Sequence, residues 1–205
     1  MQLGLHLSAS QSNALAQYAA LLMRWNAVHN LTAIDTPADV LSHHLFDSLA
    51  IVPEMQRILG PRVSRLLDVG AGGGLPGVVL AVAAPHLQVT LVDKVQKKIA
   101  FLTQVKVELE LQNVKCVHSR VETLRTESPF ALIVARAFAS LTEFVSVTRH
   151  LLAPNGWWFA MKGALPSDEL SELSRSHPGV CARVVRLHVP RLNAERHLVL
   201  MQDAR

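Results

Sequence analysis

Five glycines fall within ten residues at Asp68-Val-Gly-Ala-Gly-Gly-Gly-Leu-Pro-Gly77. A short apolar segment, Arg65–Val69, leads into these glycines, and an apolar run over about residues 76–84 follows them. Glycine lets a backbone turn sharply and approach a ligand without a Cβ in the way. The pattern therefore predicts a strand, a ligand-binding loop and a helix in immediate succession.

The chain beyond this loop alternates between strand patterns and helix patterns. Further strands are predicted at 88–93, 113–118, 130–134 and 157–161, with Pro154-Asn-Gly156 as a turn before the last of them. Helices are predicted at about 95–110, at 167–174 and after a capping box formed by Ser140 and Glu143. Residues 180–189 and 196–201 have the period-two pattern of a closing antiparallel hairpin. The whole predicts an α/β fold with a doubly wound, mostly parallel sheet that binds ligands at the carboxyl ends of its strands.

The first 60 residues have a different, helical pattern. Residues 8–26 repeat apolar side chains at helical spacing, and Ser8 with Gln11 can form a capping box. A second helix is predicted after Thr36, with Pro37 in its first turn. We therefore expect a helical N-terminal extension over residues 1–60 and a ligand-binding domain over residues 61–205.

Composition and charge narrow the class of protein. Half of the 205 residues are hydrophobic and 18% are charged, which excludes a disordered chain. The longest apolar stretches, such as residues 78–84, are too short to span a bilayer, and no secretion signal begins the sequence. The net charge of +4 favours a polyanionic partner such as nucleic acid, although proteins with this charge need not bind one. We expect a protein of the cytoplasm with no membrane partner.

Cysteine and histidine usage gives no sign of a metal site. Cys116 and Cys181 are expected to pack as small apolar side chains in a reducing compartment. His43 and His44 stand side by side without paired cysteines or suitably spaced carboxylates, which favours core or interface histidines over ligands.

Two classes of cofactor fit a glycine loop followed by an acidic residue, and Asp93 ends the second predicted strand, where it can accept hydrogen bonds from ribose hydroxyls. Gly72, Gly74 and Gly77 match the dinucleotide fingerprint. That fingerprint should begin where the strand ends, at Gly70, and in that register its last position is Leu75. The loop resembles instead motif I of the class I methyltransferases, which has an acidic residue, here Asp68, and then Gly70, Gly72 and Gly74. This resemblance implies S-adenosylmethionine as the cofactor and a Rossmann-like fold.

Several further segments resemble one family, the bacterial small-subunit ribosomal RNA methyltransferase G family, also called glucose-inhibited division protein B. The segments, in chain order, are Asn30-Leu-Thr-Ala, His43-His-Leu-Phe-Asp-Ser48, Leu67 to Gly77, Lys97-Lys-Ile-Ala-Phe-Leu102, Ser119-Arg-Val-Glu122, Ala135-Arg-Ala-Phe-Ala-Ser140, Met161-Lys-Gly163 and Glu195-Arg-His-Leu-Val199. They span nearly the whole chain. The resemblance implies methylation of guanine N7 in the decoding-region loop of 16S ribosomal RNA, with that RNA or the small ribosomal subunit as partner.

The resemblance also implies which residues contact the cofactor. The family's contacts fall on Gly70, Leu75, Val121, Glu122 and Arg136. Val121 and Glu122 follow the third predicted strand, and Arg136 follows the fourth, where it could meet the cofactor carboxylate bidentately. With Gly72, Gly74 and Asp93 from the loop argument, these residues make up the predicted cofactor site.

RNA contacts are predicted on the polar side chains near the same edge of the sheet. The candidates for substrate binding are Asn30, Arg120, Lys162 and Arg196, and Lys97 and Lys98 are weaker candidates because they suit a solvated helix face. Guanine N7 already has a lone pair, so no acid or base residue is expected. Arg136 and Lys162 are expected to act by positioning.

Other chemistries fit less well. A cytosine C5 enzyme needs a nucleophilic thiol in the site, whereas both cysteines fall in predicted strands. An enzyme that methylates exocyclic amines should have an Asn/Asp-Pro-Pro-Tyr motif where this chain has Ala135-Arg-Ala-Phe. A dinucleotide-dependent oxidoreductase and a non-catalytic RNA-binding module remain the alternative interpretations of the sequence.

Overall fold

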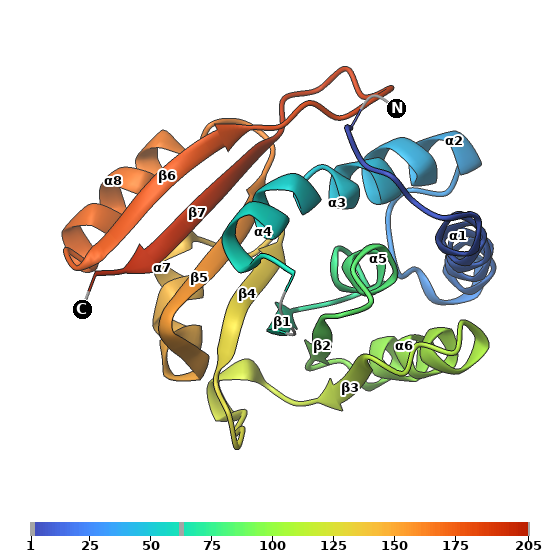
Figure 1. Ribbon diagram of the computed structural model, residues 1–205, viewed down its shortest axis with the longest axis horizontal. Coiled ribbons are helices and arrows are strands. Elements are labelled where there is room, and N and C mark those ends of the chain that lie inside the picture. The colour runs from blue at the N-terminus through green and yellow to red at the C-terminus, as the bar shows by residue number, and fades with distance from the viewer. Residues whose placement is uncertain (1–2, 62–63, 205) are drawn as a thin grey trace.

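A computed structural model describes residues 3–61 and 64–204, and within them seven strands form a single sheet (Figure 1). The strands are β1 (Arg65–Val69), β2 (Gln88–Asp93), β3 (Val114–His118), β4 (Phe130–Arg136), β5 (Leu152–Lys162), β6 (Val180–Arg186) and β7 (His197–Asp203). Their order across the sheet is β3-β2-β1-β4-β5-β7-β6. The first five are parallel, and β7 is antiparallel to both of its neighbours. The predicted α/β fold with an antiparallel hairpin is therefore confirmed, with β7 inserted between β5 and β6.

Helices cover both faces of this sheet. They are α1 (Ala9–His29), α2 (Pro37–Asp39), the π-helix η1 (Val40–Phe46), α3 (Asp47–Leu49), α4 (Val52–Leu59), α5 (Gly77–Ala83), α6 (Gln96–Glu108), η2 (Val121–Thr123), α7 (Leu141–Thr148), η3 (Arg149–Leu151) and α8 (Ser167–Ser176). Figure 1 shows α1, α5 and α6 on one side and α7 and α8 on the other. Side chains of each strand alternate between the two cores: Leu66 packs with the first group of helices and Leu67 with the second.

The N-terminal helices begin where the sequence predicts. Ser8 and Gln11 form the reciprocal capping box of α1, and the Thr36 hydroxyl accepts from the Asp39 amide to cap α2. Tyr18 and Leu22 of α1 lie in the same core as α5, β1 and β2. The domain boundary near residue 60 stays a prediction. None of the helices among the described residues has the length and apolar character needed to cross a membrane.

Several elements differ from the sequence prediction. Strand β6 ends at Arg186, whereas the prediction continued to residue 189, and the single helix predicted after Thr36 is divided into α2, η1, α3 and α4. Strands β5 and β4 differ in their bounds. Phe130 pairs with Leu152 and Leu132 pairs with Trp157, so Pro154–Gly156 bulges out within β5, and that strand starts five residues before the predicted Trp157. Asn155 adopts the left-handed conformation at φ 60° in this bulge. Strand β4 continues to Arg136, whereas the prediction ended it at residue 134.

Candidate functional site

The glycine loop lies at the carboxyl edge of the parallel strands, between β1 and α5. The amides of Gly70 and Ala71 donate to the Val92 carbonyl oxygen at 2.9 and 3.0 Å, which ties the loop to the end of β2. Gly70, Gly72 and Gly74 have φ values of 67°, 56° and 91°. Residues with a Cβ rarely adopt these values, so the chain turn requires glycine at these positions.

Asp93 holds the loop from the end of β2. Its Oδ2 accepts from the Gly72 amide at 3.0 Å, its Oδ1 accepts from the Val95 amide at 2.9 Å, and the Lys98 ammonium lies 3.8 Å from Oδ2. The side chain is almost fully buried. A carboxylate has about four lone-pair sites, so these bonds leave acceptor capacity for a ligand. The predicted contact with ribose hydroxyls stays a prediction.

A cavity of about 270 Å³ opens beside this loop, and we call it the glycine-loop cavity. The residues that line it include Gly70, Asp93, Lys98, Arg120, Val121 and Glu122. Four predicted cofactor residues therefore meet there, together with Arg120, which the sequence assigned to the RNA. Apart from Gly70 and its two chain neighbours, no atom of the described chain lies within 4 Å of the position that a Cβ on Gly70 would occupy, so the loop presents open space to a ligand.

Two other predicted cofactor residues face the protein interior. Gly74 and Leu75 are buried, and a Cβ on Gly74 would lie 2.5 Å from Val78 Cγ2 and 2.9 Å from Leu102 Cδ2. Tyr18 of α1 is fully buried and donates its hydroxyl to the Gly73 carbonyl oxygen. Tyr18 falls within the helix predicted at residues 8–26, where it is one of the regularly spaced apolar positions, and the structure shows that it also supports the loop.

Asp68 fixes the far end of the loop. It is fully buried, and its Oδ2 accepts from the Gly77 amide at 2.8 Å, while Oδ1 has no hydrogen-bond partner among the described residues. Burial raises the pKa of this carboxyl to about 7. The acidic residue of the motif therefore anchors α5 to β1.

A second cavity of about 400 Å³ lies at the carboxyl ends of β4 and β5 and at the start of β7, and we call it the arginine cavity. Its polar lining includes His44, Asp47, Arg136, Lys162, Gly163 and Arg196. The chain after β4 joins the two cavities, because Arg136 and Ala137 line the arginine cavity while Phe138 lines the glycine-loop cavity.

Asp47 joins two arginines in the arginine cavity. Arg196 Nε donates to Asp47 Oδ1 at 3.1 Å, and Arg136 Nη1 lies 3.7 Å from Asp47 Oδ2. The Asp47 side chain is 5% exposed, and those of Arg136 and Arg196 are 24% and 22% exposed. Burial raises the pKa of Asp47, and the two guanidinium groups oppose that rise. Sequence reasoning did not select Asp47, although it lies within one of the segments quoted for the family resemblance.

His44 and the preceding residue also contact Arg136. Arg136 Nη1 donates to the His43 carbonyl oxygen at 3.1 Å and lies 3.2 Å from His44 Nδ1, while His44 Nε2 lies 2.8 Å from Thr32 Oγ1. Burial, and then the Arg136 charge, lower the pKa of His44 to about 4, so the ring is neutral near pH 7. The π-helical turn of η1 presents both the His43 carbonyl and the His44 ring to Arg136, a use of irregular helix common at functional sites.

Lys162 lines the arginine cavity, but its ammonium is already bound. Lys162 Nζ lies 2.9 and 2.8 Å from the two carboxylate oxygens of Glu169 and 3.4 Å from the Phe138 carbonyl oxygen. Glu169 Oε2 also accepts from the Leu141 amide at the start of α7, at 2.9 Å. The pair therefore ties β5 to α8, to α7 and to the chain that follows Arg136.

Two remaining candidates meet at the C-terminal end of α1, one of them, Lys97, reaching it from α6. Asn30 caps this helix in the left-handed conformation and is exposed, and Lys97 Nζ donates to the His29 carbonyl oxygen at 3.2 Å. Neither belongs to the lining of the two cavities.

The family model and the similar proteins that match this chain carry the same description. The family model described as rRNA small subunit methyltransferase G matches residues 11–199. A relative with the name Ribosomal RNA small subunit methyltransferase G from Methylobacillus flagellatus is 46% identical over 200 residues, which cover 98% of this chain and 93% of the relative. Another of that name from Burkholderia multivorans is 52% identical over 197 residues, covering 94% and 84%.

Solved structures match in fold at low sequence identity. A SAM-dependent methyltransferase from Aquifex aeolicus has a TM-score of 0.59 at 16% identity, covering 84% of this chain and 97% of the other. An rRNA methylase from Streptococcus thermophilus has a TM-score of 0.54 at 16% identity, covering 85% and 100%. These likenesses show the shared fold of the sheet and its helices.

Proposed function

This chain belongs to the rRNA small subunit methyltransferase G family, and from this membership we propose how its two cavities divide the reaction. The protein is an S-adenosylmethionine-dependent methyltransferase of guanine N7 in 16S ribosomal RNA. We assign the cofactor to the glycine-loop cavity and the target guanine to the arginine cavity. The segment that lines both, Arg136 to Phe138, then lies where the methyl group must pass.

The observation that carries the cofactor assignment is the open glycine loop beside Asp93. Gly70, Asp93, Val121 and Glu122 line one cavity at the carboxyl edge, where sheets of this kind bind ligands. We propose that these four contact the cofactor, while Gly72, Gly74 and Leu75 shape the loop. The strand order also favours this cofactor over a dinucleotide, because dinucleotide-binding sheets have the order 3-2-1-4-5-6 without the inserted antiparallel β7.

Methylation of guanine N7 requires that the reactants be oriented and does not require removal of a proton. S-adenosylmethionine supplies the methyl group when it is bound, and guanine N7 already carries the lone pair that accepts it. In our proposal, Arg136 meets the cofactor carboxylate at the end of β4, where the glycine-loop cavity joins the arginine cavity. Arg196 orients the guanine through O6, the acceptor beside N7 on the same base edge. A cation close to N7 would oppose the positive charge that N7 acquires, so these side chains must act away from that atom.

RNA contacts outside the cavities remain proposals. Arg120, at the mouth of the glycine-loop cavity, and Asn30, at the end of α1, are exposed and accessible to a bound RNA. Whether the partner is 16S ribosomal RNA alone, an assembly intermediate or the small ribosomal subunit in the cytoplasm depends on which form presents the target guanine.

Mapping the methyl group tests this function. We expect the protein to transfer label from methyl-labelled S-adenosylmethionine to one guanosine of unmodified 16S ribosomal RNA and to form 7-methylguanosine. Parallel reactions with naked transcript and with assembled small subunits identify the form of the substrate. Calorimetry should detect binding of S-adenosylmethionine and none of NAD. Label on another atom, or NAD binding without S-adenosylmethionine binding, would contradict the proposal.

A second prediction concerns Lys162, which we propose as a positioning residue that acts through Glu169. Lys162→Ala should lower kcat at least tenfold and leave the affinity for S-adenosylmethionine within about twofold, because it removes alignment and not cofactor contacts. Glu169→Gln should cause a similar loss, and the double variant should be no worse than either single one.

The same comparison tests the predicted direct contact of Lys162 with the substrate. If the ammonium donated to the RNA itself, Glu169→Gln would free it and leave kcat unchanged. Additive losses in the double variant would equally contradict a shared role. Thermal unfolding of each variant shows whether the protein remains folded at the assay temperature.

A further inference from the structure

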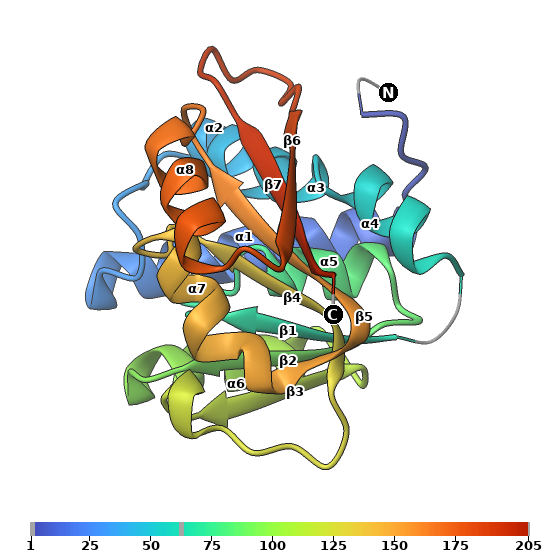
Figure 2. The same cartoon turned by 90° about the vertical axis from the view of Figure 1, so that its left-hand side faces the viewer.

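The connection between β6 and β7, residues 187–196, emerges beside the arginine cavity, and we call it the hairpin loop. Because β7 is antiparallel to both neighbours, β6 runs parallel to β5 and ends at the same carboxyl edge. Arg186, His197 and Lys162 pair across these three strands at that edge. Figure 2 shows the loop projecting beyond the sheet, and its last residue, Arg196, lines the arginine cavity.

Positive charge is concentrated on this hairpin. Residues 183–196 contain four arginines, at 183, 186, 191 and 196, and one acidic residue, Glu195. Arg183 pairs with Glu54 and Arg196 with Asp47, so the charge open to a partner is that of Arg186 and Arg191. Arg186, His188 and Arg191 are exposed. Arg191 and His188 make no hydrogen bond or ion pair with any residue in the described ranges, so both are available to an outside partner. The neighbouring α8 has the opposite balance, with Asp168, Glu169 and Glu172 against Arg175.

Buried residues in the middle of the hairpin loop anchor it to the rest of the protein. Val189 and Pro190 are buried, and Pro190 and Arg191 border an apolar cavity with Leu3, Leu5 and Leu7 of the N-terminal segment. Anchoring of the middle of the loop fixes the backbone that carries the exposed side chains of Arg186, His188 and Arg191. A bound partner would therefore contact charged side chains on a backbone segment that is already fixed by packing.

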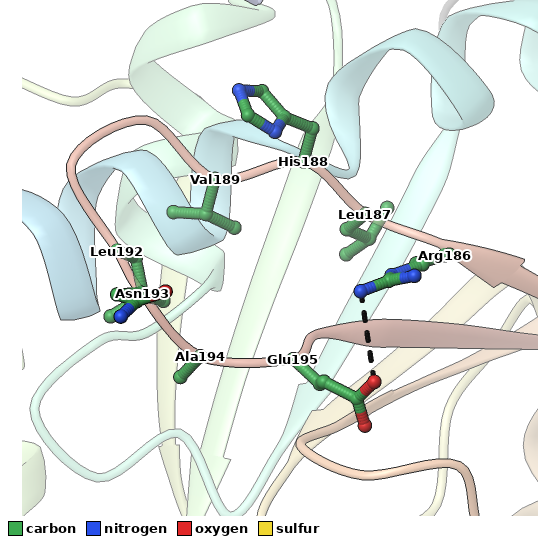
Figure 3. A pocket seen from close by; sticks show the side chains of 8 residues that line it. All are labelled: Arg186, Leu187, His188, Val189, Leu192, Asn193, Ala194 and Glu195. Atoms are coloured by element: carbon green, nitrogen blue, oxygen red, sulfur yellow. Dashed lines mark ion pairs between the residues drawn. The ribbon is translucent and has the colours of Figure 1, made fainter.

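The hairpin loop encloses an open cavity of about 620 Å³. Figure 3 shows Arg186 and Glu195 facing each other where the strands lead into the loop, and their closest atoms are 3.6 Å apart. Their side chains are 74% and 57% exposed, so water and salt weaken this ion pair. A phosphate group can therefore compete with Glu195 for the Arg186 guanidinium, which forms strong charge-assisted bonds with phosphate oxygens.

We propose that the hairpin loop, together with Arg186 at the end of β6 that leads into it, is a docking surface for the phosphate backbone of the substrate RNA next to the target nucleotide, with Arg186 and Arg191 as its contacts. The inference rests on the proposed function, which places the target guanine in the adjoining arginine cavity. Excess positive charge matches the polyanion, and the shared edge of the sheet places both surfaces within the reach of one RNA strand.

Single substitutions test the surface by RNA affinity and its salt dependence. Arg186→Ala and Arg191→Ala should each weaken binding of a 16S ribosomal RNA transcript about three- to tenfold. Each should also make the slope of log affinity against log salt shallower by about 0.7–0.9, the value for one lost phosphate contact. Glu195→Gln should strengthen binding about two- to threefold, because it frees Arg186 and removes a negative charge. The affinity for S-adenosylmethionine should stay unchanged in all three.

Arg175→Ala is the matched control, since Arg175 on α8 is exposed and paired with Glu172 as Arg186 is with Glu195. It should leave RNA affinity at the wild-type value. Wild-type affinity and slope in both hairpin variants, or an equal loss in Arg175→Ala, would overturn the docking surface. Methylation by the wild-type protein in the same preparation tests the proposed function separately: its absence would overturn both proposals, whereas unaffected hairpin variants would overturn only this one.

Discussion

Replacement of Asp47 by asparagine should lower kcat/KM for RNA methylation about 100-fold. The substitution keeps the shape of the side chain but removes the charge that lies between the Arg136 and Arg196 guanidinium groups. Hydrogen bonds to a charged group are worth about 1.5–3 kcal/mol each, and a shift of about 1 Å in a positioned group can cost about 100-fold in rate. Asp47 contacts neither substrate nor cofactor in our proposal, so we regard it as a positioning residue.

A double-mutant cycle separates positioning from a general loss of stability. We expect Asp47→Asn and Arg196→Gln to be strongly non-additive in kcat/KM, because each removes the same contact. Asp39→Asn is the matched control, since Asp39 precedes the same helical segment, lies on the surface and pairs with His43 at 3.5 Å. It should retain wild-type kcat/KM. Unchanged kcat/KM in folded Asp47→Asn, or additive effects in the cycle, would contradict the role of Asp47.

The parts of the fold that the sequence predicts well are those with local signals. Strands β1 and β2 have the predicted bounds because each is an apolar run with a clear end: β1 stops before Gly70, and β2 stops at the acidic Asp93. The Pro154–Gly156 bulge was predicted as a turn because proline, asparagine and glycine favour both structures. Only the pairing of Phe130 with Leu152 shows that the strand continues on both sides.

The sequence predicts the residues that line the glycine-loop cavity better than the contacts within the arginine cavity. Asp93 is the last residue of β2, and Gly70 and Val121 follow the ends of β1 and β3. Parallel strands bring their ends to one edge, so the glycine-loop cavity was predictable from these positions. The bond between Arg196 and Asp47 joins residues 149 positions apart, and periodicity gives no information about such a contact. The pairing of Lys162 with Glu169 was missed for a related reason, since the turn between β5 and α8 decides whether these side chains meet.

Gly77→Ala should destabilise the protein strongly, although Gly77 contacts no ligand in our proposal. A Cβ at this position would lie 2.3 Å from Leu91 Cδ2, 2.5 Å from Asp68 Oδ2 and 2.9 Å from Asp68 Cβ. Leu91 and Asp68 are both fully buried, so neither can move aside into solvent. The start of α5 would have to separate from β1 and β2, and the Gly77 amide would lose its bond to Asp68.

The expected magnitude follows from these two losses. Overpacking costs about 1–3 kcal/mol and a lost bond to a charged group about 1.5–3 kcal/mol, against a total stability of about 5–15 kcal/mol. At about 2–4 °C per kcal/mol for a chain of this size, the Tm should fall by about 5–24 °C in thermal unfolding followed by circular dichroism. Gly163→Ala provides the control, because the nearest atom to its Cβ would be Arg196 Nη1 at 3.9 Å, and its Tm should stay within about 2 °C of wild type. A wild-type Tm for Gly77→Ala would mean that α5 does not pack directly on Asp68 and Leu91, and the anchoring of the glycine loop by Asp68 would then have to be abandoned.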